Sequence, residues 1–424
     1  MRILWVCNVV LPEFSDEFNI RHTVFGGWMS GMLRELECVD GLDVALAFPI
    51  RDEARRHDGV CCGHRYYAFD ASRDSMGQDD RDCDDMIADF KRILSDYQPD
   101  VVHLWGTEYP HSWAIMKACE AMRMARRTVC HIQGILTYIK EHYALGLPSE
   151  LLSRQDSNGH SIADDIASFD RQSARERDVM RGAGFVMGRT FWDESCARQI
   201  CQDVKYRFCE EILREPFYQN KEFWDVDKCH RHTIFVSQAG YPVKGFHFLL
   251  RAVGILKEKY PDLAVYVGGS NPMAEDRTGN ISSYGRYLKS FGEKYGALKY
   301  IHFTGLLDAA QMIEQYRSAN VFVSASTIED TSNSIAEAMM VGTPIVSSCV
   351  GGVPGWVHHL NDCILYPCDE AYMLAAWVRR IFEDDDLARK LSSAARAYVN
   401  QRHNKKSIKK QLLSIYREAC DQEA

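Results

Sequence analysis

The sequence predicts an α/β protein built from two parallel-sheet halves. Apolar runs of strand length alternate with helical segments along the whole chain, a pattern typical of parallel sheets covered by helices. A polar, aromatic-rich stretch at residues 214–232 separates two such series. The chain has 424 residues, of which 46% are hydrophobic, enough to fill more than one core. We therefore expect one domain at residues 1–213, a second at 232–402, and a terminal helical segment at 403–424.

The elements follow from periodicity, since short apolar runs predict buried strands and apolar residues at helical spacing predict amphipathic helices. Strands are expected at residues 3–7, 44–48, 101–105, 128–133 and 184–188 in the first half, and at 233–236, 264–267, 300–303, 321–324 and 345–347 in the second. Helices are expected between them at 27–37, 84–97, 112–125, 246–259 and 312–318, and a last one at 405–420.

Charge and composition exclude several functional classes. The net charge is −9 and no long basic tract is present, which argues against a nucleic-acid partner held by bulk electrostatics. Fifteen cysteines without regular spacing indicate a reducing compartment. The N-terminus enters a strand directly, without the apolar core of a signal peptide. No stretch approaches the roughly 18–20 apolar residues that a membrane helix needs. We expect a soluble cytoplasmic protein.

The most informative segment is a polar turn between a strand and a helix in the second half. Glu329 and Glu337 bracket this turn, Thr331 and Ser332 are suited to cap the helix, and Gly342 is suited to end it. The amides of a helix N-terminus favour an anion such as a pyrophosphate. Carboxylates beside that site are placed to accept hydrogen bonds from sugar hydroxyls. The alternative is two solvated glutamates around an ordinary helix start.

The surrounding residues make the signal specific. The segment from Glu329 to Pro354 contains Asn-Ser-x-x-Glu-Ala-Met, then Gly-x-Pro, then Gly-Gly, and it resembles the signature of glycosyltransferase family 4. The resemblance implies the GT-B architecture, with a cleft between two Rossmann-like domains and the terminal helix packed back on the first. It also implies a retaining enzyme that needs no metal or other cofactor. The donor would be a nucleotide sugar, with UDP expected as the nucleotide.

The same resemblance implies roles for individual residues. Glu337 would bind the ribose hydroxyls and Glu329 the donor hexose. Lys244 would stabilise the departing diphosphate, and the backbone near Gly305 would contact the base. Sugar and diphosphate would be held by the amides around Thr331, Ser332, Asn333 and Ser334.

Lys244 also stands out on its own, because it follows a predicted strand, where parallel sheets bind ligands. The alternative is a solvated turn lysine. Family members usually carry an arginine shortly before this lysine, but here Gln238 occupies that place and supplies no charge. Arg189, which follows the last strand of the first half, is our candidate for the missing cation.

In the first half, Gly26 and Gly27 open the first long helix and resemble the glycine loop that faces the donor phosphates. Polar residues near the ends of other strands are candidates for the acceptor side: Glu108, His111, Gln133 and His142. Gln133 stands where several family members have a histidine.

Two other clusters contain metal-ligand residue types. The acidic run at residues 80–85 precedes a helix whose N-terminus attracts acids, which explains it without a metal. His57, Cys61, Cys62 and His64 lack the paired spacing of a zinc site and are expected in a surface loop. We therefore predict no metal site.

The variants found here look most like bacterial enzymes of exopolysaccharide, capsule or lipopolysaccharide assembly. The acceptor would then be a glycan or a lipid-linked sugar at the inner membrane face. Basic residues of the last helix fit either a solvated face or weak attraction to anionic lipids: Lys405, Lys406, Lys409, Lys410 and Arg417. Two alternatives remain open: a sugar-nucleotide epimerase of the same fold, and a binding partner without turnover, which Gln238 and Gln133 keep possible.

Overall fold

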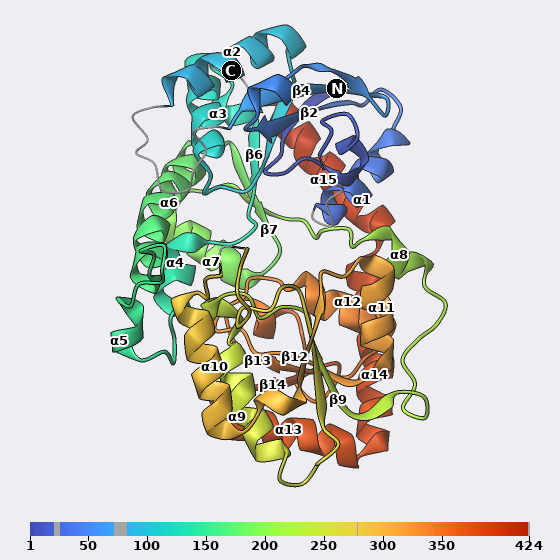
Figure 1. The fold of residues 1–424 in the computed structure, drawn as a ribbon. Coiled ribbons are helices and arrows are strands. Elements are labelled where there is room, and N and C mark those ends of the chain that lie inside the picture. Colours follow the sequence, from blue (N-terminus) through green and yellow to red (C-terminus); the bar gives the residue numbers. More distant parts are fainter. Residues whose placement is uncertain (21–25, 72–82, 278, 423–424) are drawn as a thin grey trace. The chain divides into compact units, whose positions relative to one another are not determined.

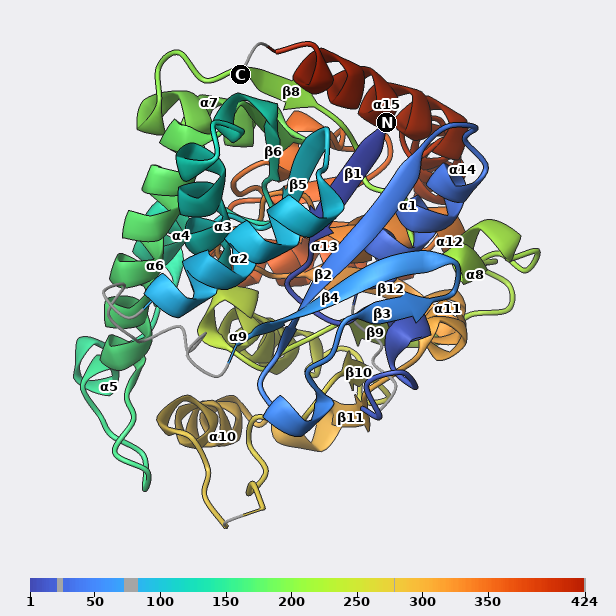
Figure 2. The ribbon, with the colours of Figure 1, turned by 90° about the horizontal axis from the view of Figure 1, so that it is seen from above.

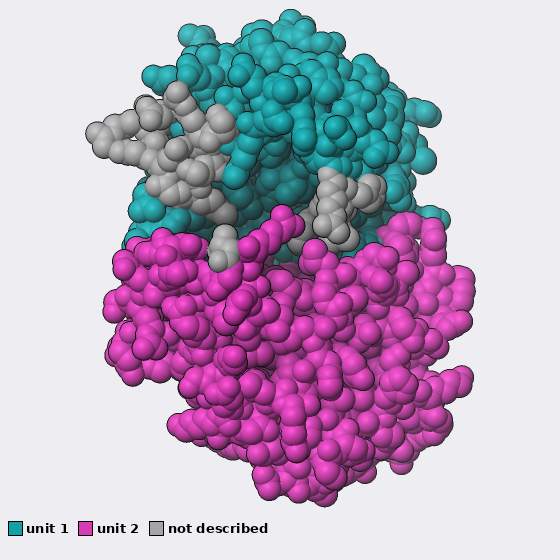
Figure 3. Space-filling model, in the orientation of Figure 1, with its two compact units in different colours: residues 1–138, 167–214, 403–424 teal, residues 139–166, 215–402 magenta. Residues whose placement is uncertain are grey.

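A computed structural model describes residues 1–20, 26–71, 83–277 and 279–422. The chain divides into two compact units, shown in different colours in Figure 3. Unit 1 comprises Met1–Tyr138, Ala167–Arg214 and His403–Ala424, and unit 2 comprises Ile139–Ile166 and Glu215–Arg402. The terminal residues thus join the first unit, and residues 139–166 join the second although they precede the predicted seam.

Unit 1 is built on an eight-stranded sheet of order β3-β4-β2-β1-β5-β6-β7-β8. The strands are β1 Arg2–Val6, β2 Asp43–Ile50, β3 Gly59–Cys61, β4 His64–Asp70, β5 Val101–Trp105, β6 Thr128–His131, β7 Phe185–Gly188 and β8 Tyr206–Phe208. All neighbours are parallel except β3 and β4, which form an antiparallel hairpin. The inner strands are mostly apolar because helices cover both faces of the sheet, with His103 of β5 and Thr128 and His131 of β6 as exceptions.

The helices of unit 1 lie on the two faces of this sheet. Helices α2 (Asp84–Tyr97) and α3 (Pro110–Ala121) pack together on one face, and α1 (Gly27–Glu37) and α15 (Lys405–Cys420) lie on the other (Figure 2). The last helix is tied to the sheet by Tyr416, whose hydroxyl accepts a 2.9 Å hydrogen bond from Trp5 Nε1 and lies 2.6 Å from His103 Nδ1. Helices α6 (Ile162–Gly182) and α7 (Phe191–Ile200) precede and follow β7.

Unit 2 has a fully parallel six-stranded sheet of order β11-β10-β9-β12-β13-β14 (Figure 1). Its strands are β9 His230–Val236, β10 Ala264–Gly268, β11 Ile301–Gly305, β12 Ala319–Ser324, β13 Ile345–Ser348 and β14 Ile364–Tyr366. Its larger helices are α9 Phe246–Leu256, α10 Ser283–Tyr295, α11 Ala309–Ser318, α12 Asn333–Val341, α13 Ala371–Glu383 and α14 Asp385–Arg402. The strand order reverses between β9 and β12, and open α/β sheets bind ligands at the carboxyl ends of such strands.

The predicted fold class, two Rossmann-like parallel-sheet domains, is confirmed. The expected helices 27–37, 84–97 and 405–420 match α1, α2 and α15. Four features were not predicted from the sequence: α10, α13, α14 and the β3–β4 hairpin. The surface-loop prediction is wrong for Cys61 and His64, which belong to the strands of that hairpin, whereas His57 precedes the hairpin and Cys62 lies in its turn.

The acidic run begins outside the described residues, at 80–82, and Asp84 and Asp85 form the first turn of α2. Within the described ranges, no group of three histidine, cysteine or acidic side chains is placed to hold a metal ion. None of the described helices has the length and apolar character needed to cross a bilayer.

Candidate functional site

The centre of the candidate site is an ion pair between Lys244 and Glu329. Lys244 ends the short turn Pro242–Lys244 that follows β9, and Glu329 lies in the loop after β12. Lys244 Nζ is 2.6 Å from Glu329 Oε1, and Ser326 Oγ donates a 2.7 Å hydrogen bond to the same oxygen. Burial works against the lysine charge, but Glu329 and Tyr241 outweigh it and raise the pKa of Lys244 above its ordinary value. Lys244 therefore keeps its positive charge at neutral pH.

The backbone holds the two loops together at Gly245. This residue has φ of +62°, and a Cβ there would lie 1.9 Å from the carbonyl oxygen of Ala325. Beside it, the Thr327 amide donates a 2.8 Å hydrogen bond to the Val243 carbonyl. The loop after β9 is thus fixed directly on the loop after β12. This contact places Lys244 beside Glu329.

The predicted Gly-Gly turn fixes Glu329 from the other side. The Gly352 amide donates a 2.9 Å hydrogen bond to the Glu329 carbonyl. Gly351 has φ of +51°, and a Cβ there would lie 2.0 Å from the same oxygen. Only glycine fits so close to the Glu329 carbonyl, so the Gly-Gly motif is needed for the structure as well as for any contact with ligand.

Helix α12 begins immediately after this loop. Ser332 occupies the N-cap position, but its side chain caps no amide, so the expected capping hydrogen bond is absent. The Thr331 hydroxyl is buried and has no hydrogen-bond partner among the described residues. Glu337 lies within the helix and is buried, and Gly342 ends the helix with φ of +92°, as predicted. The helix N-terminus presents its positive end beside Glu329.

Two further predicted residues lie at strand ends of unit 2, one after β9 and one at the end of β11. Gln238 follows β9, is exposed, and accepts a 3.2 Å hydrogen bond from the Tyr241 hydroxyl. Gly305 ends β11 with φ of +78°, and its carbonyl accepts a 2.8 Å hydrogen bond from the Gly269 amide. No atom lies within 4 Å of the place that a Cβ on Gly305 would take, so the backbone is open there.

In unit 1, Gly26 and Gly27 start α1 as predicted. Gly26 has φ of +80°, and a Cβ on Gly27 would lie 2.9 Å from Arg214 Cγ. The helix start therefore needs glycine to pack against Arg214.

Arg189 is buried in unit 1 and ion-paired. Its Nη1 is 2.8 Å from Glu211 Oε2, and Glu211 Oε1 accepts a 2.8 Å hydrogen bond from Gln133 Nε2. His131 Nε2 lies 3.6 Å from that second oxygen, and His403 Nδ1 lies 2.9 Å from the Glu211 carbonyl. The arginine proposed as an available cation is thus already neutralised. Glu211 was not predicted from the sequence. Its only signal there is that Glu210 and Glu211 form an acidic pair in an otherwise apolar segment.

The acceptor-side candidates separate into different environments. Glu108 is buried, which raises its pKa, and its Oε2 accepts a 2.8 Å hydrogen bond from the Thr107 amide. His111 is fully buried and stacked on Tyr109 at 5.0 Å between ring centroids, as a core residue would be. His142 ends helix α4 (Leu136–His142) and groups with unit 2.

A second carboxylate near Glu108 was also missed. Glu176, on α6, is fully buried and accepts hydrogen bonds of 2.8 and 2.9 Å from the amides of Leu136 and Thr137. Burial, helped by the negative charge of Glu108, raises the pKa of Glu176 to about 7. It caps the start of α4 and carries a proton part of the time near neutral pH.

The part of the chain that carries this geometry matches a known protein family. Residues 220–398 match the family model described as glycosyl transferases group 1. The chain has a GT-B fold and carries a group 1 glycosyltransferase domain. The matched residues include Lys244, Glu329, Glu337 and Gly305, so the predicted resemblance is confirmed at the level of a GT-B glycosyltransferase of group 1.

Relatives of the chain by sequence include proteins named as glycosyltransferases. The chain is 26% identical over 198 residues to an uncharacterized glycosyltransferase of Methanocaldococcus jannaschii, covering 46% of this chain and 47% of the relative. It is 26% identical over 174 residues to the lipopolysaccharide core biosynthesis glycosyltransferase LpsD of Rhizobium meliloti, covering 41% and 46%. The matched region thus spans about half the length of these curated relatives.

Solved structures match over nearly the full length of the chain. Sucrose-phosphate synthase from Thermosynechococcus elongatus superposes with a TM-score of 0.73 at 17% identity, covering 99% of this chain and 98% of that one. Anabaena HepE, solved in complex with UDP-glucose, superposes with a TM-score of 0.69 at 16% identity, covering 99% and 100%. At these identities the likeness establishes the fold.

Proposed function

We propose that this glycosyltransferase moves a hexose from a UDP-sugar to a glycan or lipid-linked acceptor, with retained anomeric configuration. The observation that carries the proposal is the Lys244–Glu329 pair beside the N-terminus of α12. It combines a cation, an anion-favouring helix end and a hydroxyl acceptor at the carboxyl ends of two adjacent parallel strands. A nucleotide sugar needs each of these groups. The UDP-glucose complex of HepE supports the choice of nucleotide.

In this mechanism the ion pair is a preorganised arrangement that the donor separates. Lys244 turns to the diphosphate and stabilises the negative charge that grows as the glycosidic bond breaks. Glu329 then accepts a hydrogen bond from a hexose hydroxyl, and Glu337 from the ribose. The amides from Thr331 to Ser334 hold the diphosphate, and the backbone at Gly305 contacts the base.

Unit 1 supplies the remaining proposed groups. The glycines that start α1 approach the donor phosphates, and Glu108 and Gln133 line the acceptor side. Arg189 would act by positioning, because it holds Glu211, and Glu211 in turn orients Gln133. The positive field at the diphosphate then comes mainly from Lys244 and the helix amides, so we propose that no metal ion is required.

A role in assembly of cell-surface polysaccharide is supported by the lipopolysaccharide relative. Contact with the inner membrane face would rest on the exposed Lys406 and Lys410, because Lys405 and Lys409 both pair with Glu35 of α1.

The experiment that tests this function is a thermal-shift panel of nucleotide sugars followed by product analysis. UDP and one UDP-hexose should raise the melting temperature, and mass spectrometry with lipid extracts should show a glycosylated acceptor. Isomerised donor without acceptor product would indicate an epimerase. UDP binding without turnover across the panel would indicate a binding protein.

A further inference from the structure

A second hollow lies in unit 2, at the edge of the sheet opposite the Lys244–Glu329 pair. It has a volume of about 620 Å³ and is formed by the segment before β9 and by α14. Trp224 fixes its position, because its amide donates to the Val341 carbonyl at 2.9 Å and its Nε1 donates to the Ala319 carbonyl at 2.8 Å. These carbonyls lie at the end of α12 and the start of β12, whereas Lys244 follows the end of β9.

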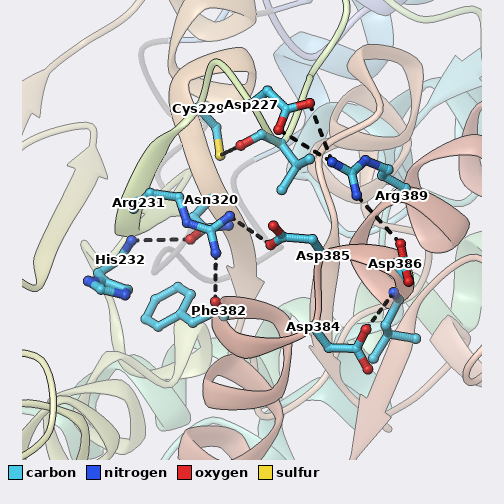
Figure 4. A network of polar contacts seen from close by, with 12 residues as sticks. Asp227, Cys229, Arg231, His232, Asn320, Phe382, Asp384, Asp385, Asp386 and Arg389 are labelled. Atoms are coloured by element: carbon cyan, nitrogen blue, oxygen red, sulfur yellow. Dashed lines mark hydrogen bonds and ion pairs between the residues drawn. The ribbon is translucent and has the colours of Figure 1, made fainter.

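Three cationic side chains line this hollow, and two of them have carboxylate partners. Lys228 Nζ lies 3.3 Å from Asp225 Oδ2. Arg389 lies between Asp227, at 3.3 Å, and Asp386, at 3.5 Å, within the polar network drawn in Figure 4. Arg396 is the third, and among the described residues no carboxylate lies within 4 Å of it.

Arg396 is also partly withdrawn from water. Its guanidinium carbon lies 3.3 Å from the centroid of the Phe223 ring, and its Nε is buried without a hydrogen-bond partner among the described residues. Burial lowers its pKa with no carboxylate to oppose the effect. Packing on Phe223 explains the position of the stem. The same packing does not explain the buried Nε–H, because burying a donor without an acceptor costs free energy.

Neutral donors surround this cation. The hydroxyls of Ser392 and Ser393 line the hollow. Asn400 also lines it, and its Nδ2 uses one of its two hydrogens in a 2.6 Å hydrogen bond to the Arg396 carbonyl. Arg396 and Asn400 also line an adjoining hollow of about 350 Å³. Hydroxyl, amide and planar guanidinium donors together suit an anion with several oxygens, and phosphate has this geometry. The volume is that of a small-molecule site and exceeds what a bare phosphate would fill.

We propose that this hollow binds a small phosphate-bearing molecule of sugar-phosphate size through Arg396. The site is separate from the proposed donor site, and α12 connects the two, with its first turn beside Glu329 and its last residues beside Arg396. Occupancy of the hollow can therefore be measured independently of sugar transfer.

The test uses the full-length protein and isothermal titration with glucose 6-phosphate, inorganic phosphate and glucose. Glucose 6-phosphate should bind at one saturable site, inorganic phosphate more weakly, and glucose not at all. Arg396→Leu should weaken glucose 6-phosphate binding at least about tenfold, the loss expected for a charged hydrogen-bond donor. Arg380→Leu is the matched control and should bind as the parent does, because Arg380 pairs with Asp384 at 2.8 Å and does not line the hollow. Lys244→Ala should also leave this binding unchanged.

A second variant avoids disturbing the packing on Phe223. Ser393 is exposed, so Ser393→Asp should fold normally while adding a carboxylate that competes for Arg396. It should weaken glucose 6-phosphate binding as strongly as Arg396→Leu. The proposal is overturned if neither sugar phosphate nor phosphate binds. It is equally overturned if binding survives both variants, or if Lys244→Ala abolishes it, which would place the phosphate in the donor site.

Discussion

At the scale of single residues, the candidate site depends on a division of work between two glutamates. Glu329 is partly exposed and paired with Lys244, whereas Glu337 is buried within α12. We propose that the loop carboxylate binds the transferred sugar and that the carboxylate within the helix binds the nucleotide.

Alanine substitutions of the two glutamates should therefore have different effects. Glu329→Ala should abolish transfer while UDP still binds, because that carboxylate is assigned to the hexose. Glu337→Ala should weaken UDP binding by about 1–3 kcal/mol, the cost of lost hydrogen bonds to the ribose. Calorimetric titration with UDP and a transfer assay on both variants check this. Equal loss of UDP affinity in the two variants would disprove the division of roles.

Arg189 is a second residue whose role can be measured. Removing it leaves Glu211 buried with an unpaired charge, so Arg189→Ala should destabilise unit 1 by about 3–5 kcal/mol. The double variant with Glu211→Ala should lose less than the sum of the two single losses, because the remaining charge is gone. Denaturant unfolding of the four proteins measures this coupling. Additive effects would mean that the pair is not formed in solution.

Glu176 should make stability depend on pH. Its pKa is about 7 in the folded protein and about 4.5 when unfolded, so folding favours the protonated acid. The free energy of unfolding that this protonated acid contributes is complete below pH 4.5. It is lost as the pH rises through 7, and the loss is roughly 3 kcal/mol.

Glu176→Gln removes this titration, so the variant should gain stability relative to the parent between pH 5 and pH 8. Denaturation midpoints at several pH values give the comparison, and the exposed Glu141→Gln serves as the control. A constant difference between variant and parent across this range would show that Glu176 stays ionised.

At the scale of elements, the site is built from three loops locked together by glycine. Gly245 meets the Ala325 carbonyl and Gly351 meets the Glu329 carbonyl, each at a positive φ. These contacts explain why a short motif positions Lys244 and Glu329 so closely, although 85 positions separate them in the sequence.

Alanine at either glycine should therefore damage both fold and activity. Gly245→Ala and Gly351→Ala should each cost roughly 1–3 kcal/mol or more, since the added methyl meets backbone and φ is unfavourable. Gly240→Ala and Gly355→Ala are matched controls, because a Cβ at either position has no atom within 4 Å. Thermal melting and transfer rates test the contrast, which fails if all four variants behave alike.

At the scale of the whole molecule, each unit is a parallel sheet with helices on both faces, and the described residues offer no metal-binding group. The proposed chemistry relies on Lys244 and the N-terminus of α12 for positive charge.

Transfer should accordingly survive chelation. Activity measured after EDTA treatment and dialysis should equal that of untreated protein, with added magnesium or manganese giving no increase. Complete loss on chelation, restored by either ion, would show that a metal acts at the diphosphate and would return attention to the acidic run that starts at residue 80.

The sequence by itself determined the α/β class, most strand positions, and the Lys244 and Glu329 loops. Such features are local, because apolar periodicity and turn residues record which way each short segment faces. It did not reveal the hairpin at Cys61 and His64, nor α10. The first strand of the hairpin has only three residues, too few for a clear periodic signal. Helix α10 is amphipathic, and its pattern was overlooked.

Only the tertiary structure decided which charges are available. Arg189 looks like an open cation in the sequence, yet Glu211 neutralises it, and the solitary Arg396 was not noticed at all. The membership of residues 139–166 and of α15 in their units is also a tertiary result. The physical reason is that pairing and burial depend on residues far apart in the chain, which sheet order brings together and local pattern does not encode.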